Sequence, residues 1–140
     1  MQLPDIDFLN KKFLYRLTHV SKNKELLAKA VGIKGDYKPY VVDATAGLGR
    51  DAFLLAYLGC RVVALERVKI IAEQLQQALQ LALDDPRFAA SQINLQFIHA
   101  DAKDYLTQIS DRELPDVIYL DPMYPERTKS ALVKTFLKRG

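Results

Sequence analysis

The sequence predicts a parallel α/β sheet covered by helices on both faces, and three observations lead to this fold class. Short apolar runs alternate with longer segments in which apolar residues recur at helical spacing. Every apolar run ends next to an acidic residue, and the 140-residue length fits one domain. A ligand of such a fold is expected outside the carboxyl ends of the strands.

A helical segment is predicted for residues 1–38, ahead of the sheet. Apolar residues at positions 8, 9, 13, 14 and 17 have the spacing of a short amphipathic helix. Ser21 is a typical N-terminal cap for a second helix, and Gly32 is a typical end. Residues 39–140 are then predicted to form the ligand-binding domain.

Residues 41–56 predict a buried strand, a glycine-rich turn and the start of a helix. The strand ends at Asp43, and the turn contains Gly47 and Gly49. Glycine tolerates positive φ and lets a ligand approach the backbone, and a helix start offers unpaired N–H groups. The pattern lacks the third glycine of a dinucleotide-binding turn, and Asp43 would repel a pyrophosphate. It suits an uncharged or cationic ligand, although an ordinary strand-to-helix turn has the same features.

Three further strands are predicted by apolar runs or by alternation of apolar and polar residues. They cover residues 61–65, 93–99 and 116–120, and the segments between them predict helices over 68–83 and 104–109. A final helix is predicted from Ser130. No repeat or linker divides the chain.

An acidic residue stands at or just after the end of each predicted strand. Besides Asp43 these are Glu66, Asp101 and Asp121. Since the carboxyl ends of parallel strands share one edge of the sheet, we expect four carboxylates in one crevice. Glu66 lies 23 residues after Asp43, close to the interval at which an acid accepts the hydroxyls of a ribose. Asp101 and Ala102 are placed to meet an adenine.

The stretch from Asp121 to Tyr124 is the most specific candidate for chemistry. Pro122 and Pro125 restrict its backbone, and a rigid loop positions a reacting group. The Asp121 carboxylate and the Pro122 carbonyl can accept hydrogen bonds from an amino group on a base, while Tyr124 stacks on the base. The alternative is a strand-ending turn with a partly buried tyrosine.

Composition argues against several other classes. No apolar run approaches the roughly 20 residues that span a bilayer, and no signal-peptide pattern is present, so a cytoplasmic location is expected. The single Cys60 is predicted to be a core residue. His19 and His99 stand apart from other ligand types, so no metal is expected, and His99 is predicted to have a structural role. No serine-nucleophile motif occurs.

Charge is distributed unevenly along the chain. Residues 1–38 carry eight Lys/Arg against four Asp/Glu, and residues 126–140 carry five against one. Residues 39–125 carry seven against twelve. Two basic ends around an acidic middle are compatible with a phosphate-bearing partner, and equally with a solvated surface.

These motifs resemble those of class I S-adenosylmethionine (SAM)-dependent methyltransferases, which have a Rossmann-like fold. The loop at Asp121 is similar to the D/N-P-P-Y/F loop of amino-methyltransferases, with Met123 in place of the second proline. More narrowly, the chain resembles the bacterial ribosomal RNA small subunit methyltransferase J family, which acts on a guanine N2. The stretches that carry the resemblance are residues 30–37, 42–53, 59–62, 65–67, 98–100, 119–125 and 130–134.

The resemblance implies methyl transfer from SAM to the exocyclic N2 of a guanine in 16S ribosomal RNA. The expected partner is that RNA or the small ribosomal subunit. The predicted cofactor-binding residues are Asp43, Gly47, Gly49, Arg50, Asp51, Glu66, Arg67, Asp101, Ala102 and Asp121. The predicted catalytic residues are Asp121, Pro122 and Tyr124.

Members of that family continue through three more strands of a seven-stranded sheet. This chain is therefore expected to hold only the first four strands, with the C-terminal part of the methyltransferase domain missing. The fourth strand would then be an exposed edge through which chains self-associate. Three alternatives stay open. They are a dinucleotide oxidoreductase, an RNA-binding fragment without catalysis, and a methyltransferase acting on DNA adenine or protein glutamine.

Overall fold

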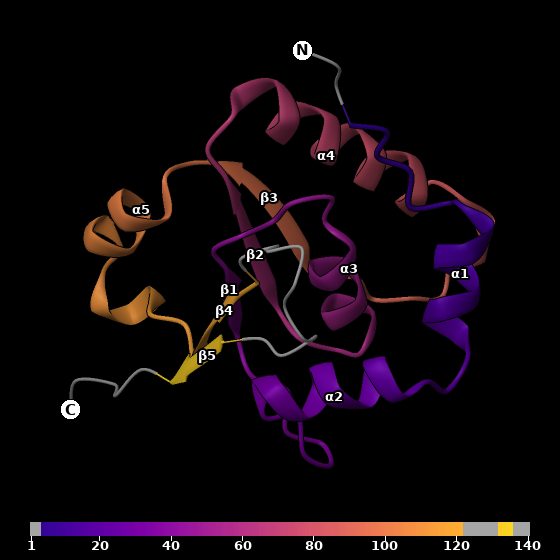
Figure 1. Cartoon of the computed structure of the whole chain (residues 1–140), viewed down its shortest axis with the longest axis horizontal. Coiled ribbons are helices and arrows are strands. Elements are labelled where there is room, and N and C mark those ends of the chain that lie inside the picture. Colours follow the sequence, from indigo (N-terminus) through magenta and orange to yellow (C-terminus); the bar gives the residue numbers. More distant parts are fainter. Residues whose placement is uncertain (1–3, 122–131, 136–140) are drawn as a thin grey trace.

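The computed structural model describes residues 4–121 and 132–135, which form one sheet with helices on both faces (Figure 1). The strand order is β3-β2-β1-β4-β5. The strands are β1 (Val41–Asp43), β2 (Val62–Glu66), β3 (Leu95–His99), β4 (Val117–Leu120) and β5 (Leu132–Thr135). The first four are mutually parallel, which confirms the predicted parallel α/β fold.

The two central strands are buried on both faces. All three residues of β1 and the first four of β2 are buried, as expected for strands between two helical layers. Val41 of β1 pairs in register with Val62 of β2 and with Val117 of β4. This register places Asp43, Glu66 and the end of β4 along the same edge of the sheet.

Four helices cover one face of the sheet and one helix covers the other (Figure 1). The larger layer contains α1 (Lys11–Thr18), α2 (Lys22–Val31), α3 (Arg50–Tyr57) and α4 (Lys69–Leu83). Phe53 of α3 is fully buried there and contacts the rings of Phe8, Phe13 and Phe88. On the opposite face, Val42, Val63 and Leu65 pack against α5 (Ala102–Gln108).

The second N-terminal helix begins after Ser21 and ends at Gly32, as the sequence predicts. The first begins later than the apolar spacing indicates, because Phe8 and Leu9 precede α1. Asn10 caps α1 by accepting from the main-chain nitrogens of Lys12 and Phe13, and Ser21 caps α2 through Lys24. Gly32 ends α2 with φ +88°, a left-handed conformation that favours glycine. The buried apolar residues of both helices belong to the same core cluster as α3, so this segment packs directly on the sheet domain.

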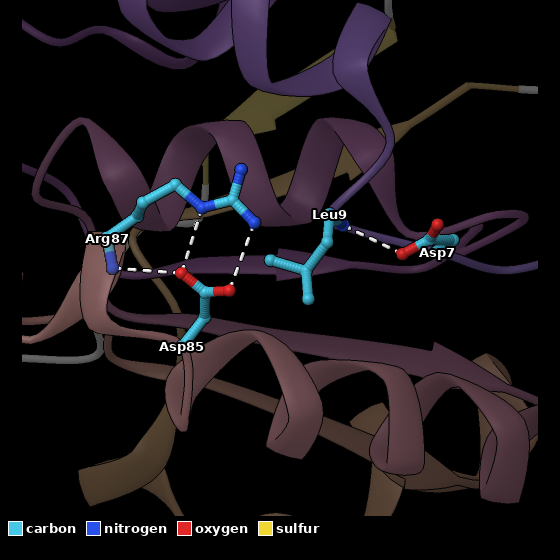
Figure 2. Close-up of polar contacts among 4 residues, drawn as sticks. All are labelled: Asp7, Leu9, Asp85 and Arg87. Atoms are coloured by element: carbon cyan, nitrogen blue, oxygen red, sulfur yellow. Dashed lines mark hydrogen bonds and ion pairs between the residues drawn. The ribbon is translucent and has the colours of Figure 1, made fainter.

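Two acidic residues fix turns at the surface near α4 and near the N-terminus (Figure 2). Asp85 precedes the short helix η1 (Pro86–Phe88) and accepts hydrogen bonds from the main chain and the guanidinium of Arg87. Asp7 accepts from the main-chain nitrogen of Leu9 at 2.9 Å. A second short helix, η2 (Asp111–Glu113), leads into β4. These turns position the chain between elements without entering the site described below.

The C-terminal predictions need a correction. Residues Leu132–Thr135 form β5, whereas a helix was predicted from Ser130. β5 pairs antiparallel with β4, with Leu120 opposite Leu132. The sheet therefore has a fifth strand, and β4 is an interior strand. The predicted exposed edge at β4 is wrong, because β1 and β5 cover both of its sides.

Candidate cofactor site

A cavity of about 390 Å³ opens at the carboxyl ends of the parallel strands. It is lined by Ala44, Thr45, Ala46, Gly47, Leu65, Glu66, Arg67, Ala100, Asp101, Ala102 and Asp121. These residues lie at the end of β2 or directly after β1, β2, β3 and β4, so the lining comes from four segments that are distant in sequence. The location is the one at which open α/β sheets bind ligands.

Six of the ten predicted cofactor residues line this cavity. They are Gly47, Glu66, Arg67, Asp101, Ala102 and Asp121. The remaining four, among the residues that the structure describes, lie outside the lining. They are Asp43, Gly49, Arg50 and Asp51. The predicted catalytic residues Pro122 and Tyr124 fall outside the described residues.

The turn after β1 brings the main chain to the cavity wall. The main-chain nitrogen of Thr45 donates to Asp43 Oδ1 at 2.9 Å, which bends the chain directly after the strand. Gly47 has φ +55° and lines the cavity, so a side chain there would be strained. Gly49 has a different reason to be glycine: a Cβ would meet Leu75 and Phe8 at 2.8 and 2.9 Å, inside the core.

One acidic and one basic residue line the cavity at the end of β2. Glu66 is half-buried, and its Oε2 accepts from the main-chain nitrogen of Val68 at 2.8 Å. A carboxylate has further acceptor capacity, so Glu66 can also accept from a ligand in the cavity. Arg67 is exposed, and its carbonyl lies 3.1 Å from Nε2 of His99. His99 thus ties the ends of β2 and β3 together, which agrees with its predicted structural role.

The segment after β3 forms the next part of the wall. Asp101 is the N-terminal cap of α5 and accepts from the main-chain nitrogen of Asp104 at 3.2 Å. Ala102 is the first residue of α5 and lines the cavity beside it. A capping carboxylate has further acceptor capacity, so Asp101 can also accept from an amino group in the cavity.

Asp121 closes the cavity at the end of β4. It is buried, with 6% of its surface exposed, and its main-chain nitrogen donates to Oγ1 of Thr45 at 2.8 Å. Thr45 also contacts Asp43, with 3.3 Å between Oγ1 and Oδ1. The sequence reasoning did not single out Thr45. Its position, two residues after the acid that ends a predicted strand, was the signal that could have identified it.

Asp43 lies under the turn and does not open to the cavity. It is 1% exposed, and among the described residues its Oδ2 has no hydrogen-bond partner. Burial, together with the negative charges of Asp51 and Asp121, raises the pKa of Asp43 to about 7, against hydrogen bonds from Thr45 that lower it. The predicted crevice of four carboxylates therefore has three acids in its lining and one beneath it.

The raised pKa of Asp43 predicts a pH-dependent stability. A carboxyl that is harder to ionise in the folded state stabilises the fold below its unfolded pKa, and this contribution is lost as pH rises through about 7. From pH 5 to pH 8 we expect the wild type to lose about 2 kcal/mol of unfolding free energy through this group. Asp43→Asn does not titrate, so its loss over that range should be smaller by about that amount.

Denaturant unfolding at the two pH values measures this difference. Asp36→Asn is the matched control, because Asp36 is exposed. If Asp43→Asn and the wild type lose the same stability between pH 5 and pH 8, Asp43 does not carry the titration.

Asp51 is held by partners that the sequence did not indicate. It lies in the first turn of α3, where Arg16 of α1 pairs with its Oδ1 at 3.2 Å and the Tyr119 hydroxyl donates to its Oδ2 at 2.7 Å. Burial and the neighbouring charge of Asp51 raise the pKa of Tyr119, so this phenol stays a donor. The network joins α1, the first turn of α3 and β4. Arg50, the first residue of α3, is exposed.

The charges of the lining indicate which ligands fit. Among the described residues, three acidic residues and one basic residue, Arg67, line the cavity. Repulsion by these acidic residues disfavours an anionic pyrophosphate. A ligand with cationic groups, hydroxyls and an amino-bearing base is favoured, because carboxylates attract positive charge and accept hydrogen bonds. Among the described residues, no group of three or more His, Cys, Asp or Glu is arranged to hold a metal ion. Nor does any helix in the described part have the length and apolarity to cross a membrane.

A parallel sheet with a glycine turn after its first strand and acids at the next strand ends defines a Rossmann-like binding domain for a nucleoside cofactor. Comparison with known proteins identifies the group within that class. The model of the SAM-dependent methyltransferase family matches residues 2–138. The chain belongs to this family, whose cofactor is S-adenosylmethionine.

Individual relatives agree with the family assignment. Ribosomal RNA small subunit methyltransferase J of Thioalkalivibrio sulfidiphilus is 50% identical over 92% of this chain and 51% of its own length. The protein of the same name from Citrobacter koseri is 51% identical over the same shares of the two chains. The chain spans about half the length of the curated relatives it matches.

Solved structures show the same fold. A SAM-dependent methyltransferase from Neisseria gonorrhoeae superposes with a TM-score of 0.71 at 33% identity, over 87% of this chain and 49% of that one. A SAM-dependent methyltransferase from Agrobacterium tumefaciens gives a TM-score of 0.53 at 20% identity, over 74% and 32% of the two chains, which supports the fold alone.

Proposed function

We propose that this chain supplies the cofactor-binding half of an enzyme that transfers a methyl group from SAM to the exocyclic N2 of a guanine in 16S ribosomal RNA. The observation that carries the proposal is the acid-lined cavity at the carboxyl ends of β1–β4. Its excess of carboxylates suits the sulfonium and ammonium charges of SAM. The names of the relatives, ribosomal RNA small subunit methyltransferases, support the RNA substrate.

Each part of the cavity has a role in holding the cofactor. Glu66 accepts hydrogen bonds from the two ribose hydroxyls, and Asp101 accepts from the adenine amino group beside Ala102. The left-handed backbone at Gly47, with no side chain, lets the ligand lie against the turn. When bound, SAM supplies an electrophilic methyl group.

Asp121 would contact the bound cofactor from the cavity wall and would also act on the acceptor base. The amino nitrogen of guanine is a poor nucleophile, because its lone pair is delocalised into the ring. A hydrogen bond from this amino group to the Asp121 carboxylate orients the nitrogen and stabilises the positive charge that develops on it. Pro122 and Tyr124, outside the described residues, are assigned the second acceptor and the stacking contact on sequence grounds. A strong base is not required, and the proton leaves during or after methyl transfer.

The basic ends of the chain are proposed to contact RNA phosphate. Lys11 and Lys12 are exposed on α1, and Arg127 and Lys129 belong to the other basic end, outside the described residues. Lysine and arginine bound to phosphate release counterions, so binding weakens as salt rises. A ribosomal RNA substrate places the reaction in the cytoplasm.

Transfer of labelled methyl groups to small-subunit RNA tests the proposal. The assay uses the 140-residue chain and, in parallel, an extended protein in which the remaining half of the Citrobacter koseri relative follows it. We expect label in 16S RNA with the extended protein, located at a guanine N2 by mass spectrometry of the nucleosides. Label in DNA adenine or protein glutamine instead of RNA would contradict the substrate, and no transfer to any acceptor would contradict the activity.

A further inference from the structure

The Thr45 hydroxyl makes two hydrogen bonds whose directions are fixed by their partners. Its Oγ1 lies 2.8 Å from the main-chain nitrogen of Asp121 and 3.3 Å from Oδ1 of Asp43. A main-chain N–H only donates, so the hydroxyl oxygen must accept from Asp121. The single hydroxyl proton is then left for the Asp43 carboxyl oxygen. Thr45 therefore connects Asp121 to Asp43 in one chain of hydrogen bonds.

Asp43 is the rigid end of this series of hydrogen bonds. Its side chain is buried at the end of β1, and the same Oδ1 also accepts from the main-chain nitrogen of Thr45 at 2.9 Å. The strand itself is fixed by its register with β2 and β4, where Asp43 lies opposite Ala64 and Tyr119. The main-chain nitrogen and the hydroxyl of Thr45 thus both bind Oδ1 of Asp43, which leaves the Thr45 side chain little rotational freedom.

The hydroxyl acts where the pairing between β1 and β4 gives way to the loops. The main-chain nitrogen of Ala44 donates to the carbonyl of Tyr119 at 3.0 Å, which is an ordinary inter-strand bond. Two residues after Tyr119, the N–H of Asp121 donates to the Thr45 hydroxyl. A side-chain acceptor therefore continues the pairing up to the first residue of the loop, at the wall of the cavity.

We propose that Thr45 is a positioning residue, whose hydroxyl fixes the main chain at Asp121 and thereby the carboxylate of this residue, which lines the cofactor cavity. The role assigned to that carboxylate rests on the proposed function, whereas the hydrogen bond does not. Because displacements of about 1 Å in a reacting group lower rates strongly, a bond at this point controls how Asp121 meets its ligand. Thr45→Ser keeps the hydroxyl, and Thr45→Val and Thr45→Ala remove it.

Hydrogen exchange in the 140-residue chain, followed by NMR, reads this bond directly. We expect the Asp121 amide to exchange on the order of tenfold faster in both hydroxyl-free variants, while the Ala44 amide keeps its rate. The affinity for S-adenosylhomocysteine, measured by calorimetry, should fall by a similar factor. Thr45→Ser should retain both properties. Thr107→Val is the control, since it removes an exposed hydroxyl that donates to the carbonyl of Asp104.

Several results would overturn the inference. One is an unchanged Asp121 amide in Thr45→Val and Thr45→Ala, and another is equal acceleration at Ala44, which indicates general destabilisation. A faster Asp121 amide with unchanged cofactor affinity also overturns it, as does failure of both hydroxyl-free variants to fold. If the wild type does not bind S-adenosylhomocysteine, the proposed function fails, and the comparison of amides still decides whether the hydroxyl holds Asp121.

Discussion

Asp121→Ala is expected to cause a severe loss of methyl transfer by the extended protein while leaving it folded. Asp121 combines burial with a place on the cavity wall, at the end of β4. A group aimed at developing charge in a dry site typically contributes about a hundredfold to a thousandfold in rate, and we expect a loss of that order. The backbone contact to Thr45 uses the main-chain nitrogen, which alanine retains. The variant is therefore expected to keep its contact to Thr45.

The labelled-methyl assay described above measures this loss, with circular dichroism to confirm folding. Asp104→Ala is the matched control, because Asp104 is an exposed acid of α5 that does not line the cavity. Transfer by Asp121→Ala at a rate close to that of the wild type would remove Asp121 from the reaction.

Gly49→Ala is expected to cause the largest loss of stability. Gly49 has φ +78°, and a Cβ there would meet Leu75, Phe8 and Phe97 side chains at 2.8–2.9 Å. The left-handed conformation costs about 1–2 kcal/mol for a residue with a Cβ, and overpacking of a core adds about 1–3 kcal/mol. The sum is a large part of the roughly 5–15 kcal/mol that stabilises a typical domain.

Gly32→Ala separates these two contributions. Gly32 has φ +88°, and a Cβ added there would meet no atom within 4 Å, so only the backbone penalty applies. In chemical denaturation, Gly49→Ala should therefore have a much lower free energy of unfolding than Gly32→Ala. Equal losses for the two variants would mean that the core around Gly49 adapts and that its packing role is minor.

Local patterns were sufficient to predict most of the elements. The capping residues Ser21 and Gly32 are short-range signals, and the structure places them as predicted. The glycine turn and the acids at the strand ends are short-range signals too, and all of them except Gly49 and Asp43 line the cavity. Cys60 is buried, as its apolar surroundings indicate. The parallel arrangement followed from alternation of strands and helices, since parallel neighbours require a crossover.

Long-range contacts explain what the sequence did not reveal. Gly49 was interpreted as a place for ligand approach, but the side chains that require its glycine come from an N-terminal residue, from α4 and from β3. Asp51 was assigned to the cofactor, and its partners Arg16 and Tyr119 are 35 and 68 residues away. Such contacts depend on tertiary packing, which no local pattern encodes.

The C-terminal strand shows a different limit. Residues 132–135 have apolar and polar side chains in an order that also fits a helix, and a short segment gives too few positions to separate the two periods. Pairing with β4 determines the strand. The sequence alone does not show this pairing, so the short segment was interpreted as a helix.

Binding of S-adenosylhomocysteine to the 140-residue chain tests the central claim most directly. Calorimetry should detect binding, with no comparable affinity for NAD. Glu66→Ala should weaken binding by about 1–3 kcal/mol, because the ribose hydroxyls lose their acceptor, whereas Glu73→Ala, at an exposed position of α4, should not. Equal affinity of the wild type and Glu66→Ala, or a preference for NAD, would contradict the assignment of this cavity to the methyl-donor cofactor.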